Sequence, residues 1–95
     1  MQHYVTLIRW TDQGIRNVKE TVKRAEAARK LAESEGGKLT LFYTMGRYDL
    51  IGIGEAPDDE TFNRVLLRIG TQGNVRTETL KAMTEAEAAK MLAKL

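Results

Sequence analysis

Residues 38–56 read KLTLFYTMGRYDLIGIGEA, two apolar runs separated by a short polar segment. Residues 38–45 alternate in side-chain character, and residues 50–56 form a second run with two glycines on one side. Alternation with a period of two is typical of strands. The connecting residues, Gly46-Arg47-Tyr48-Asp49, are few enough for an antiparallel hairpin. The stretch therefore predicts two adjacent strands, and the rest of the topology follows from this hairpin.

The residues before the hairpin predict one strand and one helix. Residues 2–10 are rich in β-branched and aromatic side chains, as strands are. Residues 15–35 carry apolar side chains at helical spacing. Gly14 leaves room for a break at the start of this helix, and Gly36-Gly37 end it. Its apolar positions are Ile15, Val18, Val22, Ala25, Ala28 and Ala32.

The residues after the hairpin predict a helix, a strand and a final helix. Residues 57–70 open with a proline and three acidic side chains, which suit the positive end of a helix dipole, and continue at helical spacing. Residues 74–83 predict a fourth, more polar strand. Thr84 and Glu87 form a capping-box pattern that starts the last helix.

The order of these elements predicts an α+β protein with the ferredoxin-like βαββαβ arrangement and an extra C-terminal helix. We expect one domain spanning residues 1–95, with a four-stranded antiparallel sheet in the spatial order 4-1-3-2. The two central strands are apolar on both sides, as Val5 and Leu7 against Ile8 illustrate. A sheet covered on one face normally has a polar second face. We therefore expect a homo-oligomer, a dimer or higher, in which another copy covers the open sheet face.

Composition excludes several classes of protein. The chain has no Cys and one His, which excludes disulfide frameworks, thiol nucleophiles and multi-histidine metal sites. Fifteen basic residues are interleaved with thirteen acidic ones, which argues against nucleic-acid and membrane partners. No apolar run approaches the ~18 residues of a membrane span, and no leader pattern is present. We expect a cytoplasmic protein with neither metal nor cofactor.

Three weaker features have structural interpretations that we prefer. Gly52 and Gly54 resemble half a dinucleotide-binding fingerprint, but they lie within a strand and precede acidic residues, so close helix packing is favoured. His3 has no recognisable partner and is expected to be structural or exposed. Met45, Met83 and Met91 are expected to fill cores.

The predicted topology brings polar side chains to one end of the sheet. The end of the first strand, the hairpin and the start of the fourth strand meet there. A phenol and a carboxylate, Tyr48 and Asp49, are the candidate acid–base or anchoring pair. A structural salt-bridged lock would gather the same groups, and we favour that interpretation. In either case Asp49 should contact Arg76 or a backbone N–H at this end. The other candidate ligand-binding residues are Trp10, Asp12, Asn74 and Arg76.

These segments resemble the GYD-domain family, named for a Gly-x-Tyr-Asp motif that matches Gly46, Tyr48 and Asp49. The resemblance extends from about residue 4 to residue 83, through the segments at 10–14, 24–28, 55–59 and 73–77. It implies a ferredoxin-like domain of the dimeric α/β-barrel type. Related barrels include cofactor-independent monooxygenases, lactone isomerases and ligand-sensing domains, so the resemblance alone selects no activity.

Two functions remain open from the sequence. The first, which we favour, is a small oligomeric module that binds a small molecule or another protein. The alternative is a small cofactor-independent enzyme, monooxygenase- or isomerase-like, in which Tyr48 and Asp49 act on a substrate and Arg76 anchors its anionic group.

Overall fold

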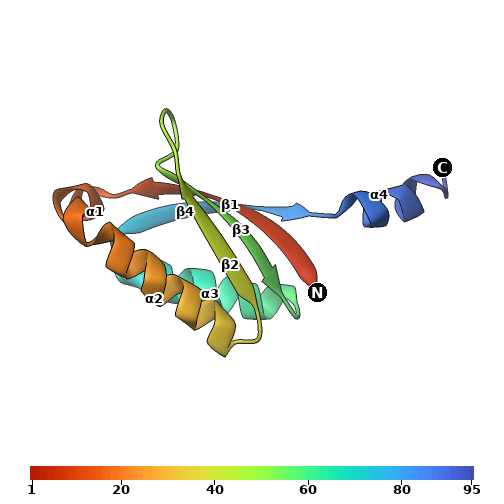
Figure 1. Cartoon of the computed structure of the whole chain (residues 1–95), viewed down its shortest axis with the longest axis horizontal. Helices are drawn as coiled ribbons and strands as arrows, with labels where there is room; N and C mark the ends of the chain where they lie inside the picture. Colours follow the sequence, from red (N-terminus) through yellow and green to blue (C-terminus); the bar gives the residue numbers. More distant parts are fainter.

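Four antiparallel strands form one sheet with the order β2-β3-β1-β4, and two helices lie across one of its faces (Figure 1). The computed structural model describes all residues, 1–95. The predicted element order and strand order are both confirmed. The elements are β1 (Gln2–Trp10), α1 (Asp12–Arg16), a 3-10 turn η1 (Val18–Glu20), α2 (Thr21–Ser34), β2 (Lys38–Tyr43), β3 (Leu50–Ala56), α3 (Asp59–Thr71), β4 (Val75–Ala82) and α4 (Glu85–Leu92).

The core lies between the sheet and the helices α2 and α3. Alternate residues of β1 point into it, and Tyr4, Thr6 and Ile8 are buried. The ring of Tyr4 stacks on the ring of Phe62 from α3, with centroids 4.1 Å apart. A Cβ atom on Gly54 would lie 2.6 Å from Phe62. The strand glycine therefore allows close helix–sheet packing, as its sequence context indicated.

The first helix differs from the prediction because the chain bends at Asn17. The predicted single helix is divided into α1, η1 and α2, and the break lies three residues beyond Gly14. Ile15 and Val22, two of the six apolar positions assigned to one amphipathic helix, are exposed at 49% and 66%. Ile15 precedes the bend, so its helical spacing from the apolar residues of α2 no longer places it on their face. Val22 lies in the first turn of α2, so the bend does not account for its exposure.

The guanidinium of Arg24 stabilises this bend. It donates hydrogen bonds to the carbonyl oxygens of Asn17, at 2.9 Å, and Gly14, at 3.3 Å. A helix break frees carbonyl groups that need donors. Arg24 supplies those donors from within α2.

The C-terminal helix α4 extends away from the sheet and its two covering helices (Figure 1). Its predicted capping box is present, because Thr84 and Glu87 exchange hydrogen bonds of 3.1 and 2.8 Å. No residue of α4 is buried. Met83 and Met91 are about half exposed, and Met45 in the hairpin is 97% exposed. The prediction that these methionines fill the core was wrong for the single chain, because the hairpin and α4 project from the sheet–helix core.

No helix covers the second face of the sheet, and its centre is apolar. Val5 lies opposite Ile53 on β3 and Leu80 on β4, while Leu7 lies opposite Ile51. Phe42 on β2 pairs with Ile51 and extends the apolar surface. Three of these side chains are about half exposed. The open-face patch is defined here as Val5, Leu7, Phe42, Ile51, Ile53 and Leu80.

Candidate functional site

The sequence-predicted residues gather at one end of the sheet, but they divide between its two faces. Trp10 follows the buried alternation of β1 and points toward the helices. Tyr48 lies on the opposite side, against Arg9 of the open face. Gly46 has a φ of +106°, which glycine adopts without strain, and so turns the hairpin. The side chain of Tyr48 and the indole of Trp10 thus lie on opposite faces of the sheet.

Asp49 makes backbone contacts at the end of β1. Its Oδ2 accepts the backbone N–H of Trp10 at 2.9 Å, and its own N–H donates to the carbonyl of Ile8 at 2.8 Å. The expected contact with a backbone N–H at this sheet end is confirmed, whereas Arg76 makes no ion pair with Asp49. The carboxylate extends the pairing of the hairpin with β1.

Tyr48 lies among arginine side chains on the open face. The guanidinium of Arg9 is 4.9 Å from the centre of its ring, and that of Arg47 is 5.8 Å away. The hydroxyl donates to Glu78 at 3.4 Å. Arg76 is the direct cross-strand neighbour of Arg9, and these groups line a shallow depression. Like charges opposite each other on a sheet repel, so this end of the face favours anions.

The sequence reasoning missed Arg9, Arg47 and Glu78. Strand parity contained part of the signal, because Arg9, Arg76 and Glu78 fall on the same face once β1 and β4 are aligned antiparallel. The alignment itself depends on the tertiary pairing of strands that are distant in sequence.

Asp12 is the first residue of α1, directly after β1. Asn74 lies in the turn that precedes β4. Asp12 is an exposed residue in the first turn of α1. Asn74 accepts hydrogen bonds from the Gln13 side chain at 2.9 Å and from the backbone N–H of Thr11 at 3.1 Å. Asn74 therefore fastens the two turns together.

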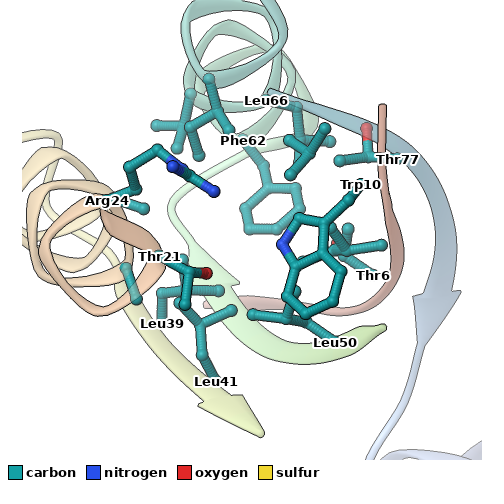
Figure 2. A pocket seen from close by; sticks show the side chains of 16 residues that line it. Thr6, Trp10, Thr21, Arg24, Leu39, Leu41, Leu50, Phe62, Leu66 and Thr77 are labelled. Atoms are coloured by element: carbon teal, nitrogen blue, oxygen red, sulfur yellow. The ribbon is translucent and has the colours of Figure 1, made fainter. Parts of the chain in front are cut away.

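A cavity of about 70 Å³ lies between the sheet and the helices, beside Trp10 (Figure 2). Its walls are mainly apolar, and they include Leu39, Leu50, Phe62 and Leu66. The indole nitrogen of Trp10 is buried and has no hydrogen-bond partner. No other buried side-chain nitrogen or oxygen of the chain is left unpaired in this way.

Several charged groups form local pairs away from this cavity. His3 lies 3.6 Å from Glu55 and 3.8 Å from Glu87, consistent with the structural interpretation. No group of three or more His, Asp or Glu side chains is arranged to hold a metal ion. No helix has the length and apolar character that crossing a membrane requires.

Asp59 joins α3 to two strands. It accepts hydrogen bonds from the Tyr4 hydroxyl and the Lys81 ammonium group. Burial and the contact with Asp59 raise the pKa of Tyr4 to about 12. The hydrogen bonds from Lys81 and Tyr4 hold the pKa of Asp59 below its usual range.

Comparison with known proteins places the Gly-x-Tyr-Asp segment at the hairpin within a recognised domain. Residues 4–92 match the GYD domain. The chain belongs to the GYD-domain family. A protein of Thermus thermophilus is 30% identical to this GYD-domain chain over 89 residues, covering 92% of this chain and 94% of the relative. That relative is named a glutamine synthetase and cystathionine beta-lyase binding protein.

Solved structures support the fold of this GYD domain. A crystal structure of a Thermus thermophilus protein has a TM-score of 0.57 at 24% identity, and covers 88% of this chain and 95% of its own. A dimeric ferredoxin-like protein from Thermobifida fusca has a TM-score of 0.51 at 15% identity, with coverages of 85% and 90%. At these identities the similarity establishes the shared ferredoxin-like fold.

Proposed function

We propose that this GYD-domain protein is a homodimeric protein-binding module. The observation that carries the proposal is the open-face patch, six apolar side chains on adjoining strands with no helix over them. An apolar sheet face of this kind marks an interaction surface. A second copy is the occupant that we favour, because the same patch on both partners makes a self-complementary interface.

Charge along the open face favours one orientation of the two copies. Arg9 and Arg76 lie at the hairpin end and make no ion pair within the chain. Glu55 lies at the opposite end of the same face, near His3. Packing that reverses the strand direction places the arginines of one copy over the acidic end of the other. That arrangement offsets the repulsion between Arg9 and Arg76.

The arrangement of Tyr48 and Asp49 favours binding over catalysis. The Asp49 carboxylate accepts a backbone N–H of β1, while the Tyr48 hydroxyl reaches Glu78 on the open face. A general acid and base must both reach one substrate. Two groups that serve separate contacts in this way support a structural role for the motif.

The partner that we propose is another protein. The name of the Thermus relative describes that relative as a binding protein for two enzymes. Helix α4 is the surface that we assign to it. Met91 and Leu92 are about half exposed on α4, and the helix lies beyond the end of β4, to one side of the sheet (Figure 1). Apolar helix faces commonly dock into grooves on partner proteins.

Light scattering on dilute protein tests the homodimer. We expect a mass twice the 10.7 kDa of the chain. Leu7→Lys and Ile53→Lys place charges in the patch and should shift the protein toward monomer. Ile15→Lys is the matched control, because Ile15 is an exposed apolar residue outside the patch. A folded wild-type monomer, or an equal effect of Ile15→Lys, contradicts the dimer.

Surface plasmon resonance tests the protein partner. Purified glutamine synthetase and cystathionine beta-lyase from the organism that produces this chain are the probes. We expect one of them to bind, and Met91→Glu to weaken binding at least tenfold without changing the dimer mass. Lys90→Glu is the control on the same helix. Absence of binding to both enzymes contradicts this assignment.

A further inference from the structure

We propose that the cavity beneath the sheet binds a small carboxylic acid with an apolar chain. The apolar chain enters the cavity, and the carboxylate accepts hydrogen bonds from Trp10 and from arginines of the adjoining groove. This site lies on the helix-covered side of the sheet, so it does not depend on the dimer or on the protein partner.

The first support for the proposal is the unpaired donor of Trp10. Buried polar groups in native proteins nearly always have a hydrogen-bond partner. The Trp10 indole nitrogen is buried and has none. Figure 2 shows this nitrogen pointing into the ring of lining side chains. The indole N–H is a donor only, so the missing partner is a hydrogen-bond acceptor.

The second support is the positive charge in a groove that adjoins the cavity. A groove of about 320 Å³ between α2 and α3 shares Arg24, Ala28, Ile69 and Val75 with the cavity wall. Arg24 and Arg68 both line this groove, and neither forms a salt bridge. Arg24 uses two donors on backbone carbonyls and retains further N–H groups.

The position of the Arg24 charge also supports an anionic ligand. Figure 2 shows its guanidinium directed toward the cavity, and the indole nitrogen lies on the edge of Trp10 that faces Arg24. A carboxylate accepts several hydrogen bonds at once, and its negative charge would pair with the two arginines, which have no anionic partner. A neutral acceptor would satisfy Trp10 but leave both arginines unpaired.

The cavity walls determine the rest of the ligand. Leu39, Leu50, Phe62, Leu66 and Ile69 surround it with hydrocarbon. An engineered apolar cavity of ~150 Å³ accepts benzene, so a cavity of about 70 Å³ accommodates a short alkyl chain. The ligand class is therefore a short-chain aliphatic carboxylate whose head remains in the wider groove.

The single Trp of the chain makes the test direct. In a ¹H–¹⁵N spectrum of the full chain, the only indole N–H signal is that of Trp10. Titration with acetate, butyrate and hexanoate should shift this signal downfield. Calorimetry should show affinity rising about fourfold for each methylene that enters the cavity. The increase should stop once the cavity is full.

Matched ligands and variants separate the carboxylate site from nonspecific apolar binding. Hexanoate should bind at least tenfold more tightly than hexanol or hexylamine. Arg68→Gln should weaken hexanoate but leave hexanol unchanged, whereas Lys19→Gln removes the same charge from an exposed surface and should have no effect. Trp10→Phe should weaken hexanoate about tenfold, since it removes one charge-assisted hydrogen bond.

Three results would overturn the proposal. The first is an indole signal that does not move with any carboxylate, which would leave Trp10 paired with water alone. The second is equal binding of hexanoate, hexanol and hexylamine, which would exclude the carboxylate class. The third is equal weakening of hexanoate by Arg68→Gln and Lys19→Gln. The dimer mass and the enzyme-binding measurements are independent readouts, so failure here leaves the proposed function standing.

Discussion

The carboxylate of Asp49 accepts the backbone N–H of Trp10 at 2.9 Å, joining the β2–β3 hairpin to the last residue of β1. The connection spans 39 residues of sequence. On one side of it the Trp10 indole faces the helix-covered cavity, and on the other Tyr48 lies with the arginines of the open face. Asp49 therefore fixes the hairpin to the end of β1 at the point where the two groups diverge to opposite faces.

Loss of the Asp49 contact should destabilise the fold. In Asp49→Ala the backbone N–H of Trp10 loses its charged acceptor, and we expect the free energy of unfolding to fall by about 1–3 kcal/mol. Asp49→Asn should retain most of the stability, because an amide oxygen also accepts. Urea denaturation measures both. Glu33→Ala, which removes an exposed carboxylate from α2, should change stability little. Equal stability of Asp49→Ala and wild type would exclude a structural role.

Substitution of two glycines by Ala should have opposite effects. Gly54→Ala places a methyl group 2.6 Å from Phe62, and overpacking of this kind costs about 1–3 kcal/mol. Gly70→Ala meets nothing within 4 Å and lies within α3, so it should stabilise by about 0.4–1 kcal/mol. Thermal melting of the two variants distinguishes these effects. A double variant with Phe62→Leu should recover part of the loss at Gly54.

Stability should decrease at alkaline pH because of Tyr4. Its pKa is raised to about 12 in the folded protein by burial and by the Asp59 contact. A raised pKa means that the folded state holds the proton more tightly than the unfolded state. The resulting stabilisation is complete below pH ~10 and is lost as pH rises through about 12. Tyr4→Phe should remove this decrease, whereas Tyr43→Phe should not; identical alkaline profiles would contradict the assignment.

The capping box should control α4 locally. Thr84→Ala removes the side-chain oxygen that accepts the Glu87 N–H, and such caps stabilise by about 0.5–2 kcal/mol. An eight-residue helix without packing is marginal in water. Cα chemical shifts should therefore show lower helicity over residues 85–92 while the melting of the sheet stays unchanged. A matching loss of global stability would mean that α4 is packed in solution.

Acid should weaken the same cap. Hydrogen bonds to Thr84 hold the pKa of Glu87 below its usual range. A group with a lowered pKa in the folded state contributes stability at pH values above its unfolded-state pKa. That contribution is lost as the pH falls through the folded-state pKa. The helicity of α4 should consequently decrease in acid more in wild type than in Glu87→Gln. An unchanged α4 signal below the ordinary glutamate pKa would reject the role of this contact.

The sequence alone determined the elements and their order. The alternation of residues 38–56, the acidic start of α3 and the Thr84 capping pattern are local signals, and local patterns contain the preference for strand, helix or cap. The strand order and the apolar open face followed as well, because few topologies join these elements without crossing.

Tertiary structure decided how the side chains at the sheet end divide. Tyr48 and Asp49 are neighbours in sequence, but Asp49 bonds to the backbone of β1 while the Tyr48 side chain lies on the open face against Arg9 and Glu78. Only the pairing of β1 with β3 and β4 fixes those contacts. The bend at Asn17 likewise separated Ile15 from the apolar face of α2. The cavity beside Trp10 arises where α2 and α3 meet the sheet. Its unpaired donor depends on distances between segments far apart in the chain, which no local pattern encodes.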